Sequence, residues 1–472
     1  MNEVDQVSYV EAAFARTVAC SVLLGSVAPA DAQCEVASLG PTRSSFSHLV
    51  AIDDDIAVVG DPGDGIGIVR VYRSDDGVWT LECTLHSSKP DADEFFGSSV
   101  AVHEDCLVVG APLADDLGPA SGAVEVFSYS GTAWAFMARL TASDGDSADG
   151  FGNSVAIYGD TIVAGAPGDE REDVIFVGSA YVFRHADSEW HQEEKLLGPR
   201  IGEFVFGESV SLRDDIVLIG SPGAGKAYIF ARDRAEWTLE TELAPSTAGA
   251  DSRFGWSVSL GIGRAAIGAF NDDGTTGSAW IFLDDLSRWT EEARVIASDG
   301  QPGEWFGRAV AINSDGTTLL VGAPNDSGFM GSTYVYRRSR ESWIERTRLL
   351  SEPSFGFGSG VAISNDWAII GAIGFAHAFA GMMDVDCNEN GSPDSCDILA
   401  GDSLDVDGDG IPDECEACLA DLDSSGEVSF NDLLAVVAVW GPCNDCTADL
   451  DDSGDVGFTD LLIMLSNWGP CE

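Results

Sequence analysis

Short apolar segments separated by tight polar turns recur at a regular spacing through most of the chain. In one copy, residues 154–157 (SVAI) precede a polar hairpin and a second apolar segment that ends in Gly-Ala-Pro. Residues 178–183 (GSAYVF) form a third segment, and a fourth begins at Trp190 and ends at Leu196. Segments of this length, bounded by Gly and Pro, are typical of β-strands. Each period therefore predicts four strands.

A Phe-Gly dipeptide opens each period, with a spacing of 48–55 residues, and Phe46-Ser47 takes the first place in the series. Glycine permits the sharp turn into a strand, and proline ends the second strand. The Phe-Gly copies are Phe96-Gly97, Phe151-Gly152, Phe206-Gly207, Phe254-Gly255, Phe306-Gly307 and Phe357-Gly358. Full Gly-Ala-Pro stands at Gly110–Pro112, Gly165–Pro167 and Gly322–Pro324, and variants stand at Gly220–Pro222 and Gly268–Phe270.

The fourth strand of each unit has one pattern, a Trp followed six residues later by Leu or Val. Its copies are Trp79–Leu85, Trp134–Leu140, Trp190–Leu196, Trp237–Leu243, Trp289–Val295 and Trp343–Leu349. The seventh unit stops after its third strand near Phe379, whereas residues 33–39 (QCEVASL) form an unassigned strand at the start. Four strands per unit at this period predict an all-β, seven-bladed propeller over residues 33–381. Residues 33–39 are expected to complete the last blade, because an open seam would expose strand edges.

These motifs resemble the FG-GAP repeat, whose best-known members form the seven-bladed propeller of integrin α subunits. In integrins, calcium sites lie in Asp-x-Asp-x-Asp-Gly hairpins between the first two strands, but here those hairpins are short, as at Tyr158-Gly159-Asp160. The resemblance therefore implies no calcium site of that type inside the ring. Two acid-rich loops, with Asp91, Asp93 and Glu94 and with Asp144, Asp146 and Asp149, are either solvated loops or a different calcium site.

The charge of the chain restricts its partners. It has 79 acidic and 24 basic residues, a net charge of -55. A phosphate backbone would be repelled, so nucleic-acid binding is excluded, whereas calcium or a cationic partner is favoured. Lys and Arg end at Arg348, and residues 382–472 alone hold 23 Asp and Glu. The segment that follows the predicted propeller is therefore strongly acidic and contains no basic residue.

The first part of this acidic tail, residues 382–417, contains two copies of an oxygen-rich pattern 19 residues apart. Carboxylate and amide oxygens at alternate positions around a Gly are what Ca²⁺ requires. Both copies resemble thrombospondin type 3 calcium repeats. The candidate ligands are Asp386, Asn388, Asn390, Asp394 and Asp397 in the first copy and Asp405, Asp407, Asp409, Asp413 and Glu416 in the second.

The second part, residues 418–472, contains two 12-residue loops of EF-hand type, offset by 28 residues. Each has ligand oxygens at positions 1, 3, 5 and 12, a backbone carbonyl at position 7 and Gly at position 6. Each loop leads into a helix with one apolar stripe, so the two helices should pack together. The candidate ligands are Asp421, Asp423, Ser425, Glu427 and Asp432 in the first loop and Asp449, Asp451, Ser453, Asp455 and Asp460 in the second.

Asp at position 12 makes this pair similar to dockerin repeats, which implies Ca²⁺ as the cofactor and a cohesin-like protein as partner. Dockerins contact cohesin at loop positions 10 and 11, which here are Phe430-Asn431 and Phe458-Thr459 instead of the hydroxyl pair common in cellulosomes. The resemblance therefore supports the calcium scaffold more than the cohesin partner.

The beginning of the chain predicts export. Residues 17–28 (TVACSVLLGSVA) are apolar and are followed by Ala30-Asp31-Ala32, the pattern of a secretory signal peptide spanning residues 1–32. A buried N-terminal helix is the alternative. No segment is long enough to predict a membrane span. The ten Cys of the mature chain are an even set; we predict Cys83–Cys106, and either Cys418–Cys443 with Cys446–Cys471 or pairings across the repeats.

Catalytic motifs do not stand out. Residues 220–226 mimic a phosphate loop, but Ala227 replaces the required Ser or Thr and a strand follows. We nominate no catalytic residue and expect a secreted or cell-surface, non-catalytic binding or adhesion protein. Its propeller would bind a protein or a glycan, and its tail would dock it to a cohesin-like or cell-surface partner. The alternatives are an extracellular polysaccharide-acting enzyme, or its accessory component, with the dockerin as assembly module, and a mainly structural envelope component.

Overall fold

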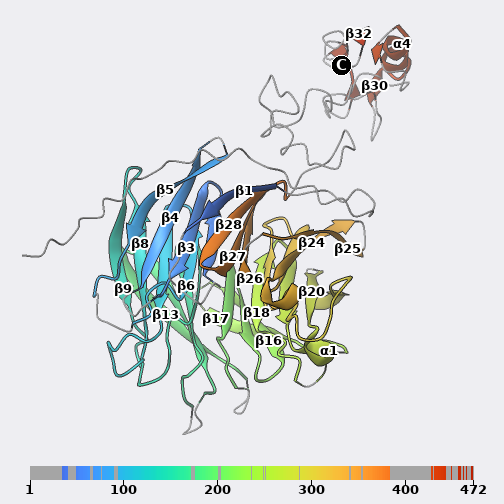
Figure 1. The fold of residues 1–472 in the computed structure, drawn as a ribbon. Coiled ribbons are helices and arrows are strands. Elements are labelled where there is room, and N and C mark those ends of the chain that lie inside the picture. The colour runs from blue at the N-terminus through green and yellow to red at the C-terminus, as the bar shows by residue number, and fades with distance from the viewer. Residues whose placement is uncertain are drawn as a thin grey trace, which may run out of the picture.

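The computed structural model (Figure 1) describes residues 34–40 and 49–382, with short gaps, and parts of the region 427–470. The gaps in the first region are 64–66, 76, 90–93, 172–175, 200–203, 235, 248, 250, 286–287, 340–341 and 352–353. The described parts of the tail are 427–428, 430–442, 448, 455–458, 461, 464 and 469–470. The predicted signal peptide, Phe46-Ser47 and the thrombospondin-like segment lie outside the described residues.

Seven four-stranded antiparallel sheets form the blades of a propeller. Blade 1 runs from inside to outside as β2 (Val50–Asp53), β3 (Ile56–Asp61), β4 (Ile68–Asp75) and β5 (Val78–Leu85). Successive inner strands contact one another around the ring, and β2 also contacts the inner strand of the last blade. The predicted all-β, seven-bladed propeller is confirmed.

Blades 2 to 6 repeat this order. Blade 2 contains β6 (Ser99–His103), β7 (Cys106–Ala111), β8 (Ala123–Tyr129) and β9 (Trp134–Leu140), and blade 3 contains β10 (Ser154–Tyr158), β11 (Thr161–Ala166), β12 (Ser179–Ala186) and β13 (Glu189–Leu197). Blade 4 contains β14 (Ser209–Arg213), β15 (Ile216–Ser221), β16 (Lys226–Asp233) and β17 (Glu236–Leu243). Blade 5 contains β18 (Ser257–Gly261), β19 (Arg264–Ala269), β20 (Ser278–Asp284) and β21 (Trp289–Val295), and blade 6 contains β22 (Ala309–Ile312), β23 (Thr318–Ala323), β24 (Ser332–Ser339) and β25 (Ser342–Leu349).

Blade 7 combines the two ends of the propeller. Its inner strands are β26 (Phe355–Ser364), β27 (Trp367–Ile373) and β28 (Phe375–Ala380), and its outer strand is β1 (Cys34–Leu39). Strand β1 pairs antiparallel with β28, from Cys34 opposite Ala380 to Leu39 opposite Ala376. This pairing covers the edge that β28 would otherwise expose, so the ring has no open seam.

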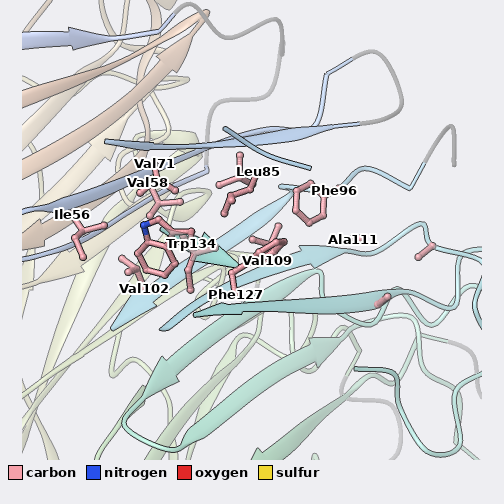
Figure 2. Close-up of a cluster of buried hydrophobic side chains, with 14 residues drawn as sticks. Ile56, Val58, Val71, Leu85, Phe96, Val102, Val109, Ala111, Phe127 and Trp134 are labelled. Atoms are coloured by element: carbon pink, nitrogen blue, oxygen red, sulfur yellow. The ribbon is translucent and has the colours of Figure 1, made fainter. Parts of the chain in front are cut away.

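The core lies between blades rather than at one centre. Side chains alternate along a strand, so each blade has two apolar faces. In β7, Leu107 and Val109 pack toward blade 1, whereas Val108 packs toward blade 3. Figure 2 shows the layer between blades 1 and 2, where Phe96 and Trp134 of blade 2 belong to one cluster with Val58 and Val71 of blade 1. In the described residues a comparable cluster fills each of the seven interfaces.

The recurring glycines set the distance between blades. In blade 3, a Cβ added to Gly165 of the Gly-Ala-Pro motif would lie 2.0 Å from the carbonyl oxygen of Gly207, the Phe-Gly glycine of blade 4. The hydroxyl of Ser154 donates to the same carbonyl at 2.9 Å. A Cβ added to the equivalent glycine of blades 1, 2, 4, 5 or 6 would lie at a comparable distance from the carbonyl oxygen of the Phe-Gly glycine in the next blade. The backbones touch here because neither side carries a side chain.

Substituting Gly165 by Ala is expected to lower the free energy of unfolding by about 1–3 kcal/mol, because the new methyl must push a neighbouring backbone away. Gly249→Ala is the matched control, since a Cβ there meets no atom within 4 Å. Denaturant titration of both variants measures the difference. Equal stability of the two variants would contradict the close-contact explanation.

A polar contact fastens the closing strand. The Oε1 atom of Glu35 in β1 lies 2.8 Å from Nδ1 of His377 in β28, and His377 also contacts the hydroxyls of Ser351 and Ser354. Burial raises the pKa of Glu35, but the hydrogen bond and charge of His377 outweigh burial and hold this pKa below its ordinary value. The seam is therefore stabilised while Glu35 is ionised.

Because the pKa of Glu35 is lowered in the folded state, its contribution is present above the ordinary carboxyl range of about 4 and is lost as the pH falls below it. We expect Glu35→Gln to cost about 0.5–1 kcal/mol near neutral pH, a small value because the Glu35 side chain is partly exposed. The deficit should shrink in acid. Denaturant titrations at both pH values test this, with exposed Glu236→Gln as control, and a pH-independent deficit would refute it.

The predicted Cys83–Cys106 disulfide is wrong, because both residues are free thiols. Cys83 lies in β5 of blade 1 and packs into the layer between blades 1 and 2. Cys106 lies in β7 and packs into the layer between blades 2 and 3. The sheet of blade 2 thus separates the two sulfur atoms. The predicted tail disulfides involve residues outside the described part of the chain.

The remaining elements are short. α1 (Asp272–Thr275) and α2 (Asp326–Phe329) lie in the loops between the second and third strands of blades 5 and 6. The described parts of the tail contain α4 (Phe430–Ala438) and four two-residue strands, β29 (Glu427–Val428), β30 (Gly441–Pro442), β31 (Asp455–Val456) and β32 (Gly469–Pro470). No helix in the described residues is both long and apolar enough to cross a membrane.

Candidate functional site: the axial channel

A cavity of about 570 Å³ lies where the starts of the inner strands converge. All seven blades contribute to its lining. The inner strands all begin at one end of the ring, and we call this end the entry face; the loops between second and third strands lie there too. The residue directly after each described Phe-Gly lines the cavity. These residues are Ser98, Asn153, Glu208, Trp256, Arg308 and Ser359.

The residue directly after Phe-Gly occupies the same structural position in each of these blades, but its residue type differs from blade to blade. The preceding Phe is fully buried in each of blades 2 to 7. The Gly of Phe-Gly has a left-handed backbone, with φ between 86° and 91° at these positions. In blades 2 to 6, its N–H donates a hydrogen bond to the backbone carbonyl of the glycine at the Gly-Ala-Pro position of the same blade. The motif thus anchors the chain at the turn, and the side chain that follows it lines the cavity.

The lining of the channel is asymmetric. Blades 2, 3 and 7 contribute the short polar side chains of Ser98, Asn153 and Ser359, whereas blades 4, 5 and 6 contribute Glu208, Trp256 and Arg308. Because the seven blades share one backbone structure, the fold itself does not require the lining side chains to differ in this way. One sector therefore offers space and hydrogen-bonding groups, and the other offers charge and aromatic surface.

Aromatic contacts hold Arg308 in place. The guanidinium carbon lies 4.3 Å from the centre of the Trp256 ring and 5.6 Å from that of Phe270. Phe270 packs edge-on against Trp256 and Trp305, with ring centres 5.0 and 5.7 Å apart. Such cation–π stacking stabilises a desolvated guanidinium. Burial lowers the pKa of Arg308 to about 10, and the charge of Glu208 partly offsets this.

Glu208 supplies the negative charge of the channel. Burial raises the pKa of its carboxyl group, and the positive charges of Arg308 and Arg253 act in the opposite direction. Its backbone carbonyl accepts a hydrogen bond from the Asn153 side chain at 3.3 Å. Within the described residues, its carboxylate accepts no hydrogen bond. It is therefore an acceptor that faces the cavity.

Strained backbone surrounds the mouth. The residue before each Phe-Gly adopts positive φ, 56° at Phe95, 65° at Val205, 60° at Arg253 and 62° at Trp305. Positive φ is unusual for bulky or β-branched residues, and clusters of such strain occur at functional sites. Glycine fills the same position at Gly150 and Gly356. Four blades thus keep large side chains where glycine would fit without strain.

Several described acids in and near the acid-rich loops of the ring pair with basic side chains, whereas Asp91 and Asp93 lie outside the described residues. Arg139 in β9 is buried with Glu94, Asp116 and Glu125, and Lys195 in β13 pairs with Asp144 at 2.8 Å. Burial raises the pKa of Asp149 to about 6, and its carboxylate accepts the N–H of Asp146 at 2.6 Å. No group of three or more His, Cys, Asp or Glu in the described residues is arranged to hold a metal ion.

Most predicted tail ligands lie outside the described residues. They are Asp386, Asn388, Asn390, Asp394, Asp397, Asp405, Asp407, Asp409, Asp413, Glu416, Asp421, Asp423, Ser425, Asp449, Asp451, Ser453 and Asp460. The backbone of Glu427 lies in β29 and that of Asp455 in β31, and Asp432 is fully buried in α4. The ligand assignment therefore stays a prediction.

The described tail strands pair reciprocally. β29 pairs with β32, and β30 pairs with β31. Gly441 and Gly469 are equivalent under the 28-residue offset of the repeats, as are Glu427 and Asp455. Each repeat therefore gives one strand from its loop and one from its end to the other repeat. This is the symmetry expected of two packed copies of one unit.

Sequence reasoning missed the channel residues. The sequence signal for these residues was the variation directly after the constant Phe-Gly dipeptide, where the residue is Ser, Asn, Glu, Trp or Arg in different blades. The rejected phosphate-loop motif is part of the blade, because its Lys226 begins β16 and pairs with Glu242 at 2.6 Å.

Four segments match the family model of the FG-GAP repeat, residues 79–127, 134–183, 237–282 and 289–336. These four segments are FG-GAP repeats. Each matched segment starts in the outer strand of one blade and ends in the third strand of the next. The FG-GAP unit in the sequence is therefore offset from the blade by one strand.

Proposed function

We propose that this protein is an exported, non-catalytic binding or adhesion protein. Its FG-GAP propeller presents a ligand-binding entry face, and its acidic tail binds calcium and docks it to another extracellular or cell-surface protein, of cohesin-like type. A binding or adhesion module is the role that an FG-GAP propeller suggests. The predicted signal peptide supports export.

The observation that carries the proposal is a set of exposed aromatic side chains on the entry face. Phe176 and Phe329 are 52% and 65% exposed, and both residues have left-handed backbone, with φ of 60° and 75°. Trp305 is 36% exposed and shares this strain. Exposed aromatic side chains are enriched where proteins bind partners. Phe204, Phe355 and Phe375 add to the same face.

The channel favours binding over hydrolysis. Most glycosidases require two carboxylates about 5–9.5 Å apart across the bond that is cleaved. Among the described lining residues, Glu208 is the one carboxylate. The polysaccharide-acting enzyme therefore remains the second candidate, and release of reducing ends from polysaccharides in parallel with binding would favour it.

A matched pair of variants tests the entry face. Trp305→Asp places a charge on this face, and Ile262→Asp does so in a hairpin at the opposite end, where Ile262 is 59% exposed. We expect Trp305→Asp to abolish retention of the labelled full-length chain on an array of immobilised extracellular proteins and polysaccharides, and Ile262→Asp to preserve it. Equal retention of both variants, or no retention of the unaltered chain, would contradict the proposal.

Calcium binding by the tail is tested on the full-length chain after chelation. Added Ca²⁺ should increase the helical circular dichroism signal, because neutralising the loop carboxylates lets the helices pack. Replacing Asp421 and Asp449, the first ligands of the two loops, with Ala should remove most of the increase. An unchanged spectrum of the unaltered chain would refute the tail assignment.

A further inference from the structure

The outer strand of blade 2 differs from the outer strands of the other six blades. Outer strands form the rim of the ring (Figure 1), where one edge of each blade has no neighbouring strand in its own sheet. Such an edge presents unpaired N–H and C=O groups, and proteins commonly protect it with charged side chains. Six of the seven outer strands contain at least one Glu, whereas β9 (WAFMARL) contains none.

The difference is sharpest at a β-bulge that the outer strands share. In blade 2, Phe136 and Ala138 pair with successive residues of β8, and Met137 between them is left out of the ladder. The equivalent residue is charged in blades 1, 3, 4, 5 and 6, where it is Glu82, Glu193, Glu240, Glu292 and Arg346. In blade 7 it is Val36, which packs into the layer between blades 7 and 1. Met137 is thus an apolar residue, 39% exposed, at a position that is charged or covered in the other blades.

The hairpin that ends in β9 has an uncharged surface. Residues 126–138 contain no Asp, Glu, Lys or Arg. The charged residues on either side, Glu125 and Arg139, are buried and pair with each other at 2.6 Å. Most of residues 130–137 are exposed, and the side chain of Phe136 is 48% exposed. An apolar strand edge therefore reaches the solvent with no charged side chain to keep other strands away.

Charge selects the partner for this edge. Two copies of a chain with a net charge of -55 repel each other wherever their acidic side chains meet. The hairpin around β9 is a surface where this repulsion is small. Two identical strand edges pair antiparallel around a two-fold axis, so the same surface serves both copies and the contact closes on itself. A basic ligand would find no acidic side chain on this edge to recognise.

We propose that the outer edge of β9 pairs with the same edge of a second copy of this chain, so that two four-stranded blades join into one continuous sheet and form a symmetric dimer. Phe136 and Met137 of each copy lie at the centre of the contact and become buried there. The contact covers the one outer strand that lacks acidic residues. It lies on the rim and not on the entry face, so this inference does not depend on the proposed function.

Sedimentation velocity of the full-length chain, run with a chelator to remove calcium-dependent contacts of the tail, tests the proposal. At loading concentrations from about 1 to 100 μM, the mass should rise from that of one chain to that of two and then stay constant. Added salt should strengthen the dimer, because it screens the repulsion between two acidic copies. Salt would weaken an association held by opposite charges.

Met137→Glu is the decisive variant, since Glu is the bulge residue of blades 1, 3, 4 and 5. In blades 1, 3 and 5 this Glu accepts a hydrogen bond from the indole N–H of the Trp in the next blade, at 3.1 or 3.2 Å. The buried indole N–H of Trp190 in blade 3 has no such partner among the described residues, so the fold should accept the change. The dissociation constant of the dimer should rise roughly tenfold or more, because the two-fold axis brings two carboxylates onto one apolar contact.

Leu239→Glu is the matched control, because Leu239 is 41% exposed beside the bulge of β17 in blade 4. It should dimerise as the unaltered chain does, and so should Met137→Leu. Thermal midpoints verify that each variant is folded. Hydrogen exchange should slow on dimerisation in residues 131–138 and not in residues 236–243. A single-chain mass at every concentration, open-ended oligomers, or an unchanged dissociation constant of Met137→Glu would overturn the proposal.

Discussion

The architecture depends on direct backbone contact between neighbouring blades. In blades 1 to 6, a glycine near the end of the second strand lies against the carbonyl of the Phe-Gly glycine of the next blade. That contact places the buried Phe rings in the layers between blades, and it fixes how closely the inner strands approach the axis. A single methyl group at the contact would widen the ring locally, so two small residues per blade determine the geometry of the whole channel.

The same constraint explains why the fold could be predicted and the candidate site could not. Because the close backbone contact requires Gly and the layer beside it holds a buried Phe in blades 2 to 7, the motif repeats visibly, and the Phe-Gly spacing with the Trp strands was enough to count seven blades. The channel residues obey no such constraint. Glu208 and Arg308 lie about a hundred residues apart in the sequence and meet only because successive turns converge on one axis. The Cys83–Cys106 pairing failed for a related reason, since nearness in sequence does not show which side of a blade a side chain faces.

Charge is organised differently in the two parts of the chain. In the ring, basic side chains of the outer strands neutralise acids of the loops, as Arg294 does for Asp272 and Arg348 for Asp326. The tail has no Lys or Arg to do so. A compact tail would need cations from outside the chain to offset repulsion between its carboxylates, and this is the physical basis on which we propose calcium for the tail rather than for the propeller.

The one-strand offset between the sequence repeat and the blade has a consequence for biogenesis. Strand β1 precedes all the other blade strands in the described chain, yet its hydrogen-bonding partner β28 is made more than 300 residues later. Until then its backbone groups have no native partner, and the last blade cannot form. The last blade therefore cannot close before β28 has been synthesised, and a chain truncated before β28 would leave strand edges open to pairing with other molecules.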